Sequence, residues 1–551
     1  MGSRAELKIV FTEVCKFLTQ NDLVNLARTS KWFCKEVALP SLYNTIVICK
    51  DPVLRDDRWA LDSGRTYLSG YRAIKKTADQ NDLMIYDRIE RLLESSHLVE
   101  IKTLVIQKNN FADVFSGRKL LQRLIDKLLE LDRVENFCIC DDMLFQTNYQ
   151  RLLKLSNLSS VRIVNLEDLN ILTESCVKSL KSLQLVLTTS SFKADCLCDR
   201  VKTKLLPNIE ELFIDDIEFS GLRLFQYLQS ESISLGGLRS LKFSHVHGLH
   251  DYNKILRELT SVYLSDVVPL NKLLRLELEF SCEMSHCDCA DNFVMDLAAR
   301  LPSLKELGLI ERTFATLGSH STEEKWDLWA CKFILHIPQV SDNLRKLSIR
   351  HNTPLNGIIT DAVEGNYLRR RTLYAHTLPK LHSLTTLIAP SVLQSLSAYE
   401  ILVCDLLWNG CDCIFCSNVM DVFDRYLMNH QFYCTKSGMY KDLIPTVLFA
   451  YAGDAMSQRI VSEVDWTIKL FSLAPISHTW NMHGYEQLNH FHDFECLYDE
   501  SVYLHLVTVI SHFLNGYMDN LVKILPSLRR CLLSGVYYLC DAKGSYNSMY
   551  D

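Results

Sequence analysis

The most regular feature of the chain is a recurring six-residue motif, apolar-x-x-apolar-x-apolar, in which x is any residue. Successive copies among the first ten lie 22 to 40 residues apart. The copies are residues 101–106, 134–139, 158–163, 180–185, 209–214, 238–243, 273–278, 304–309, 344–349, 384–389 and 528–533. The last two apolar positions alternate with a polar or variable one, as a short strand with one buried face requires. The motif therefore predicts a series of short strands.

Stretches with helical spacing precede several of these strands. Residues 117–134 place an apolar stripe on one helix face, made of Leu120, Leu121, Leu124, Ile125, Leu128 and Leu129. A helix, a short strand and a turn form the unit of a leucine-rich repeat, whose strands stack in parallel. The Leu-x-x-Leu-x-Leu core resembles that family, although the Asn or Cys that usually follows is mostly absent and the period drifts. An ordinary α/β domain in which strands happen to follow helices is the alternative.

A different pattern stands in front of the repeats, in residues 6–48. This segment resembles an F-box, the short helical module that docks onto the Skp-type adaptor of cullin-based ubiquitin ligases. The resemblance is carried by Phe17-Leu18, Asp22-Leu23, Leu26-Ala27, Ser30-Lys31 and Phe33. One departure is that Glu6-Leu7 replaces the Leu-Pro that usually opens the module, and no acidic residue stands at Ile9.

The F-box segment carries more apolar side chains than about 40 residues can bury among themselves. We expect them to form an adaptor-binding surface made of Val10, Val14, Leu18, Leu23, Leu26 and Phe33. The alternative is that they pack on the first repeats, as the cap of a solenoid does.

These patterns predict an α/β chain with an N-terminal all-helical F-box followed by an irregular leucine-rich-repeat solenoid of parallel short strands and outer helices. We expect the F-box in residues 1–50 and a helical linker or N-terminal cap in 51–100. The irregular repeats then occupy 101–390, and C-terminal repeats and a cap with a Cys-rich segment occupy 391–551.

Composition narrows the class of partner and the compartment. The 551 residues carry a net charge of -7, which argues against nucleic acid as the main partner. No run of about 18 apolar residues occurs, so we expect no membrane span. The 20 cysteines, without a signal peptide, are typical of reduced thiols, which places the chain in the cytoplasm or the nucleus.

Two local clusters could carry a site. Cys411, Cys413, Cys416 and Cys434 have spacings that a structural zinc ion accepts, and reduced thiols in a packed turn are the alternative. Arg369, Arg370 and Arg371 could receive an acidic or phosphorylated degron of a substrate, and a solvated basic face is the alternative.

The resemblance implies a function without bond chemistry. We expect the substrate-recognition subunit of an SCF-type ubiquitin ligase, in which the F-box docks the Skp adaptor, and cullin through it, while the repeats bind a protein substrate. The alternative is an F-box-like protein that binds the adaptor outside the cullin ligase and sequesters or scaffolds a partner, such as a small GTPase or a chromosomal complex. We find no motif of an enzyme, no cofactor other than the zinc option, and no sign of a nucleic-acid or membrane partner.

Overall fold

The chain divides into two compact units, residues 1–213 with 461–463, and residues 214–460 with 464–551. The computed structural model describes residues 4–48, 64–68, 78–106, 115–187, 196–216, 221–244, 263–280, 295–311, 321–350, 374–389, 515, 518–533 and 536–548. Strand β7 (Glu211–Asp216) crosses the boundary between the units.

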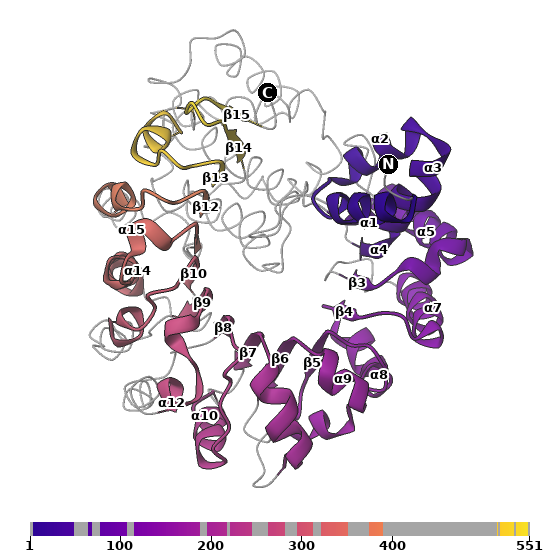
Figure 1. The fold of residues 1–551 in the computed structure, drawn as a ribbon, viewed down its shortest axis with the longest axis horizontal. Coiled ribbons are helices and arrows are strands. Elements are labelled where there is room, and N and C mark those ends of the chain that lie inside the picture. Colours follow the sequence, from indigo (N-terminus) through magenta and orange to yellow (C-terminus); the bar gives the residue numbers. More distant parts are fainter. Residues whose placement is uncertain are drawn as a thin grey trace, which may run out of the picture. The chain divides into compact units, whose positions relative to one another are not determined.

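The first unit starts with a group of helices and continues as alternating helices and strands (Figure 1). Its α-helices are α1 (Arg4–Cys15), α2 (Gln20–Thr29), α3 (Lys31–Phe33), α4 (Leu39–Asn44), α5 (Ala78–Glu94), α7 (Phe115–Leu131), α8 (Asp142–Leu152) and α9 (Glu174–Ser179). Short 3-10 or π-helical turns are η1 (Cys34–Ala38), η2 (Ser96–Glu100), η3 (Leu166–Ile171), η5 (Val201–Leu205) and η6 (Leu206–Asn208).

Six strands of the first unit form a parallel sheet in the order β2-β1-β3-β4-β5-β6. Their bounds are β1 (Thr45–Ile48), β2 (Thr66–Leu68), β3 (Thr103–Ile106), β4 (Asn136–Ile139), β5 (Ser160–Ile163) and β6 (Ser182–Leu187). Helix α4 leads directly into β1, and the ring of Tyr43 stacks on that of His97 with centroids 4.8 Å apart. The helical N-terminal region is therefore joined to the sheet without an intervening linker.

The second unit repeats the alternation. Its helices are α10 (Gly221–Ser230), α12 (Ser265–Val267), η9 (Leu270–Lys272), α14 (Ser321–His336), α15 (Val340–Asn343) and η10 (Leu378–Lys380). Its strands are β8 (Ser240–Ser244), β9 (Arg275–Phe280), β10 (Glu306–Glu311), β11 (Lys346–Arg350), β12 (Thr386–Ala389), β13 (Arg530–Leu533), β14 (Val536–Cys540) and β15 (Tyr546–Ser548). Strands β8 to β13 pair in parallel in chain order, and β14 and β15 add an antiparallel edge.

The structure confirms the strands that the motif predicts, since each of the eleven copies contributes one of the strands β3 to β13. The apolar positions are buried, as Leu276 and Leu278 of β9 and Leu307 and Leu309 of β10 illustrate. Both units are therefore built from helices followed by parallel strands, which gives an α/β, solenoid-like fold.

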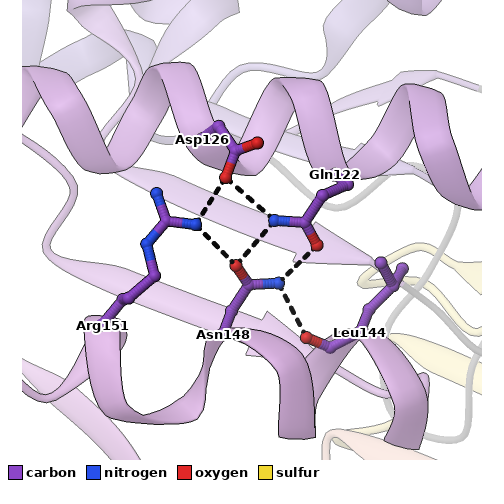
Figure 2. A network of polar contacts seen from close by, with 5 residues as sticks. All are labelled: Gln122, Asp126, Leu144, Asn148 and Arg151. Atoms are coloured by element: carbon purple, nitrogen blue, oxygen red, sulfur yellow. Dashed lines mark hydrogen bonds and ion pairs between the residues drawn. The ribbon is translucent and has the colours of Figure 1, made fainter.

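A buried amide holds one helix of the first unit against the next. The Asn148 side chain on α8 is fully buried, and its amide exchanges two 2.8 Å hydrogen bonds with the amide of Gln122 on α7 (Figure 2). Asn148 also donates to the carbonyl of Leu144 at 2.8 Å, and Arg151 donates to Asp126 at 2.5 Å. Because these polar atoms satisfy one another, the network fixes the spacing of α7 and α8 at little cost in desolvation.

Among the helices that the structure describes, none is long and apolar enough to cross a bilayer.

Candidate functional site

The N-terminal helices of the first unit enclose a small apolar core of their own. Cys15, Leu23 and Val37 are buried at its centre. Partly buried side chains surround them, namely Phe11, Leu18, Leu26, Trp32, Phe33 and Leu42. Helix α1 contributes to this core from positions 11 and 15, which are one helical turn apart and so share a face.

Three aromatic rings lock α1 against α3. The rings of Phe11 and Phe33 lie edge to face with centroids 4.8 Å apart, and those of Trp32 and Phe33 do so at 5.0 Å. Edge-to-face pairs of this kind contribute about 0.5–1.5 kcal/mol beyond the area they bury. The inner face of α1 is thus fixed by specific packing.

Hydrogen bonds at the helix starts set the angles between these helices. Thr19 caps α2, because its hydroxyl accepts from the amide of Asp22 at 3.2 Å and donates to the Asp22 carboxylate at 2.6 Å. The backbone amide of Thr19 donates to the same carboxylate, which completes a capping box. These bonds from Thr19, the hydroxyl first, lower the pKa of Asp22. Ser30 caps α3 by accepting from the amide of Phe33 at 3.1 Å.

An ion pair ties the first half of α1 to the turn η1. The ammonium group of Lys8 lies 2.8 Å from the carboxylate of Glu36. The hydrogen bond and charge of Lys8 lower the pKa of Glu36. Both groups are exposed, so we expect the pair to orient α1 and to contribute little to the free energy of unfolding.

The outer face of α1 is the unusual part of this unit, because it is apolar and exposed. Ile9 and Val10 are 66% and 57% exposed, and Phe17, just past the helix, is 79% exposed. Leu7 and Val14 are also exposed, and positions 7, 10, 14 and 17 follow one another at helical spacing. We call Leu7, Ile9, Val10, Val14 and Phe17 the α1 face. Leu7, Val10 and Val14 share one side of the helix, and exposed apolar groups gathered in this way mark interaction sites.

The residues predicted to bind an adaptor divide into two groups in this structure. Val10 and Val14 lie on the α1 face. Leu23 is fully buried, and Leu18, Leu26 and Phe33 pack around it as partly buried side chains. Leu23 therefore has no surface to offer, and a charged residue there would report on folding and not on docking.

Pattern analysis missed Leu7, Ile9 and Phe17 as surface residues. The signal was present for Leu7, because residues 7, 10 and 14 share one face of α1 while 11 and 15 share another. Both faces are apolar, so periodicity alone does not say which one is buried.

The other two predicted sites lie outside the residues that the structure describes. These are the arginines Arg369, Arg370 and Arg371, and the cysteines Cys411, Cys413, Cys416 and Cys434. Degron binding by the former and zinc binding by the latter stay predictions.

Comparison with known proteins identifies one curated relative over the whole chain. No protein-family model matches the chain. The relative is Non-SCF-type F-box protein ROY1 of Saccharomyces cerevisiae, which is 45% identical over 549 residues, covering 99% of each chain.

This finding corrects three expectations drawn from the sequence. The assignment to an SCF-type ubiquitin ligase as its substrate-recognition subunit is wrong, because a full-length relative is named a non-SCF-type F-box protein. The expected partnership with a Skp–cullin assembly and the association with ubiquitin-dependent protein degradation fall with it. The second function left open above, outside the cullin ligase, agrees better with the relative.

Proposed function

The chain belongs to the F-box protein family, and from this premise we propose that it binds a Skp-type adaptor outside the cullin ligase and holds a partner protein in a non-catalytic role. The observation that carries the proposal is the exposed apolar α1 face on a packed helical module. We propose that this module is an F-box in residues 1–50 and that the helix-strand units of 101–390 are irregular leucine-rich repeats.

The module is suited to docking because the inner face of α1 packs on the core and its outer face is exposed. The rings of Phe11, Trp32 and Phe33 hold α1 from inside. This leaves Val10, Val14 and their neighbours rigidly presented outside. Burying a side chain of this size contributes about 1.5–3 kcal/mol. For a partner that covered most of the α1 face, the free energy gained by burying these side chains would exceed the entropic cost of association.

The start of α1 supports separation of adaptor binding from cullin assembly. In place of the Leu-Pro of the F-box pattern, Glu6-Leu7 lies inside α1, which runs from Arg4 to Cys15. A proline at that point would stand at or near a helix start, since it lacks the amide that continues the helix. We propose that a helix entering the adaptor complex in this way leaves no place for cullin. Such a protein would act by sequestering or scaffolding its partner.

Substitutions on the α1 face test the docking. In the double variant Val10→Asp/Val14→Asp, capture of purified Skp-type adaptor by the full chain should fall at least about tenfold, because two charges would be buried in the interface. Met143 on α8 is also an exposed apolar residue of the first unit, at 56%, so Met143→Asp is the matched control and should capture adaptor normally. Normal capture by the double variant would place the docking surface elsewhere and reject this proposal.

A further inference from the structure

The strands β8 to β13 of the second unit begin at a common edge. The residue before each strand and the first residue of each strand form two rows along this edge. The residues just before the strands are linked by backbone hydrogen bonds, with each amide donating to the carbonyl of the previous row member at 2.7 or 2.8 Å. This first row is Arg239, Leu274, Lys305, Arg345, Thr385 and Arg529. The second row is Ser240, Arg275, Glu306, Lys346, Thr386 and Arg530, which pair in register.

The two rows concentrate positive charge. Cations occupy seven of these positions, and we call them the basic ladder: Arg239, Arg275, Lys305, Arg345, Lys346, Arg529 and Arg530. The two rows hold a single carboxylate, that of Glu306. Because the whole chain has a net charge of -7, this edge has the opposite sign to the average of the molecule.

Among the residues that the structure describes, most of the basic ladder has no carboxylate partner. Glu306 pairs with Arg275 at 3.1 Å and lies 3.9 Å from Lys346. The other five cations are exposed, and none of them has a carboxylate within ion-pair distance in the part of the chain that the structure describes. Arg239, Arg345 and Arg529 each donate to a backbone carbonyl, that of Lys272 at 3.3 Å, Ser383 at 3.0 Å and Leu528 at 2.7 Å, respectively.

The side chain of Asp541 lies near the ladder but is already engaged. The carbonyl oxygen of Asp541 accepts from Arg529 at 3.4 Å. Its carboxylate accepts from the amides of Lys543 and Ser545 at 2.7 and 2.9 Å. The Asp541 carboxylate therefore stabilises the turn between β14 and β15.

The first unit shows that this edge need not be cationic. There the equivalent first row is Asn44, Lys102, Glu135, Ser159, Lys181 and Glu210. Its charges alternate and neutralise each other, because Lys102 lies 2.8 Å from Glu135 and Lys181 lies 2.8 Å from Glu210. The same position in the repeat is thus self-paired in one unit and left cationic in the other.

We propose that the basic ladder binds an extended acidic segment, rich in Asp and Glu, of a partner protein. Neighbouring strands lie about 4.8 Å apart, so the five steps from Arg239 to Arg529 span about 24 Å. An extended chain of roughly seven residues covers that length at about 3.4 Å per residue. Guanidinium groups suit carboxylates, since they can form two parallel hydrogen bonds with one.

Nucleic acid fits this surface less well than an acidic polypeptide. None of the twelve row positions is aromatic, so the two rows lack the aromatic side chains on which the bases of a single strand stack. A net charge of -7 also opposes a long polyanion more than a short acidic segment. The inference rests on the proposed function only in taking the second unit as the part that holds a partner.

Binding of a defined peptide to the full chain tests the ladder. The probe is a fluorescein-labelled glutamate peptide of about eight residues, compared with a glutamine peptide of equal length, by fluorescence anisotropy at low salt. The ladder variant is Lys305→Glu/Arg345→Glu/Arg529→Glu, with a second version carrying Gln at the same positions in case the first does not fold. The matched control is Lys119→Glu/Arg133→Glu/Lys154→Glu, which reverses three exposed cations of the first unit.

The expected result is that the glutamate peptide binds, the glutamine peptide does not, and the ladder variant binds about tenfold more weakly or worse, whereas the control changes affinity by about twofold at most. Equal weakening in the ladder and control variants would overturn the proposal, and so would tighter binding of single-stranded oligothymidine than of the peptide. Adaptor capture is measured on the same preparations. Failure of the wild-type chain to capture the adaptor would reject the proposed function, and peptide binding would still decide the ladder.

Discussion

At the scale of single residues, α1 sorts its apolar side chains into a buried set and an exposed set. Phe11 and Cys15 face the core of the module, while Val10, Val14 and Phe17 face outward. The two faces adjoin, so the neighbouring residues Val10 and Phe11 lie on the surface and in the core, respectively. What distinguishes them is the set of aromatic partners that α3 supplies to one face only.

Thr19 is the residue whose loss should most directly loosen this module. Thr19→Ala removes the hydroxyl that caps α2, and the free energy of unfolding should fall by about 1 kcal/mol. Urea denaturation measures the difference. Thr29→Ala is the matched control, because Thr29 lies at the other end of α2 and its hydroxyl donates to the Leu26 carbonyl. A control loss as large as that of Thr19→Ala would contradict the capping role.

The pH dependence of the same variant checks the cause. Thr19 lowers the pKa of Asp22 below its ordinary value of 3.8, so the ionised carboxylate is favoured in the folded state. Its contribution is present above that ordinary value and is lost as the pH falls through the lower folded pKa. The difference between the wild-type chain and Thr19→Ala should therefore shrink below about pH 4. A difference that stayed constant down to pH 2 would mean that the carboxylate takes no part.

At the scale of elements, the repeating motif was sufficient to locate every strand from β3 to β13. The reason is physical: each copy places two apolar residues on the buried face, as Leu276 and Leu278 do in β9, and a helix must cover them. The hairpin of β14 and β15 was not predicted, because antiparallel edge strands are set by turn geometry and not by the repeat. Strands β1 and β2 were missed since they fall before the first copy.

The amide pair between α7 and α8 is another feature that no pattern could predict, because Gln122 and Asn148 are common surface residue types. Asn148→Ala should reduce the free energy of unfolding by about 1–3 kcal/mol, since it removes both hydrogen bonds between Asn148 and the part-buried Gln122 amide, whose bond to Asp126 remains. Thr147→Ala, at the exposed neighbouring position of α8, is the control and should change the free energy by less than about 0.5 kcal/mol. Equal effects of the two substitutions would show that the network contributes nothing.

At the scale of the whole molecule, the sequence predicted the family and misjudged the assembly. The F-box pattern of residues 6–48 agrees with the relative that matches 99% of the chain, whereas ligase membership does not. The pattern reports how a helical module packs and what it can cover. It carries no information on the surfaces of other subunits, so the residue pattern alone could not decide assembly with cullin.

The central claim is that this chain engages the adaptor and excludes cullin, and reconstitution tests it most directly. The purified full chain, Skp-type adaptor and cullin are mixed in equal amounts and separated by size-exclusion chromatography, with an F-box protein known to assemble with cullin as the positive control. The account predicts that the chain and the adaptor elute together and that cullin elutes apart from them. Elution of all three in one peak would contradict it.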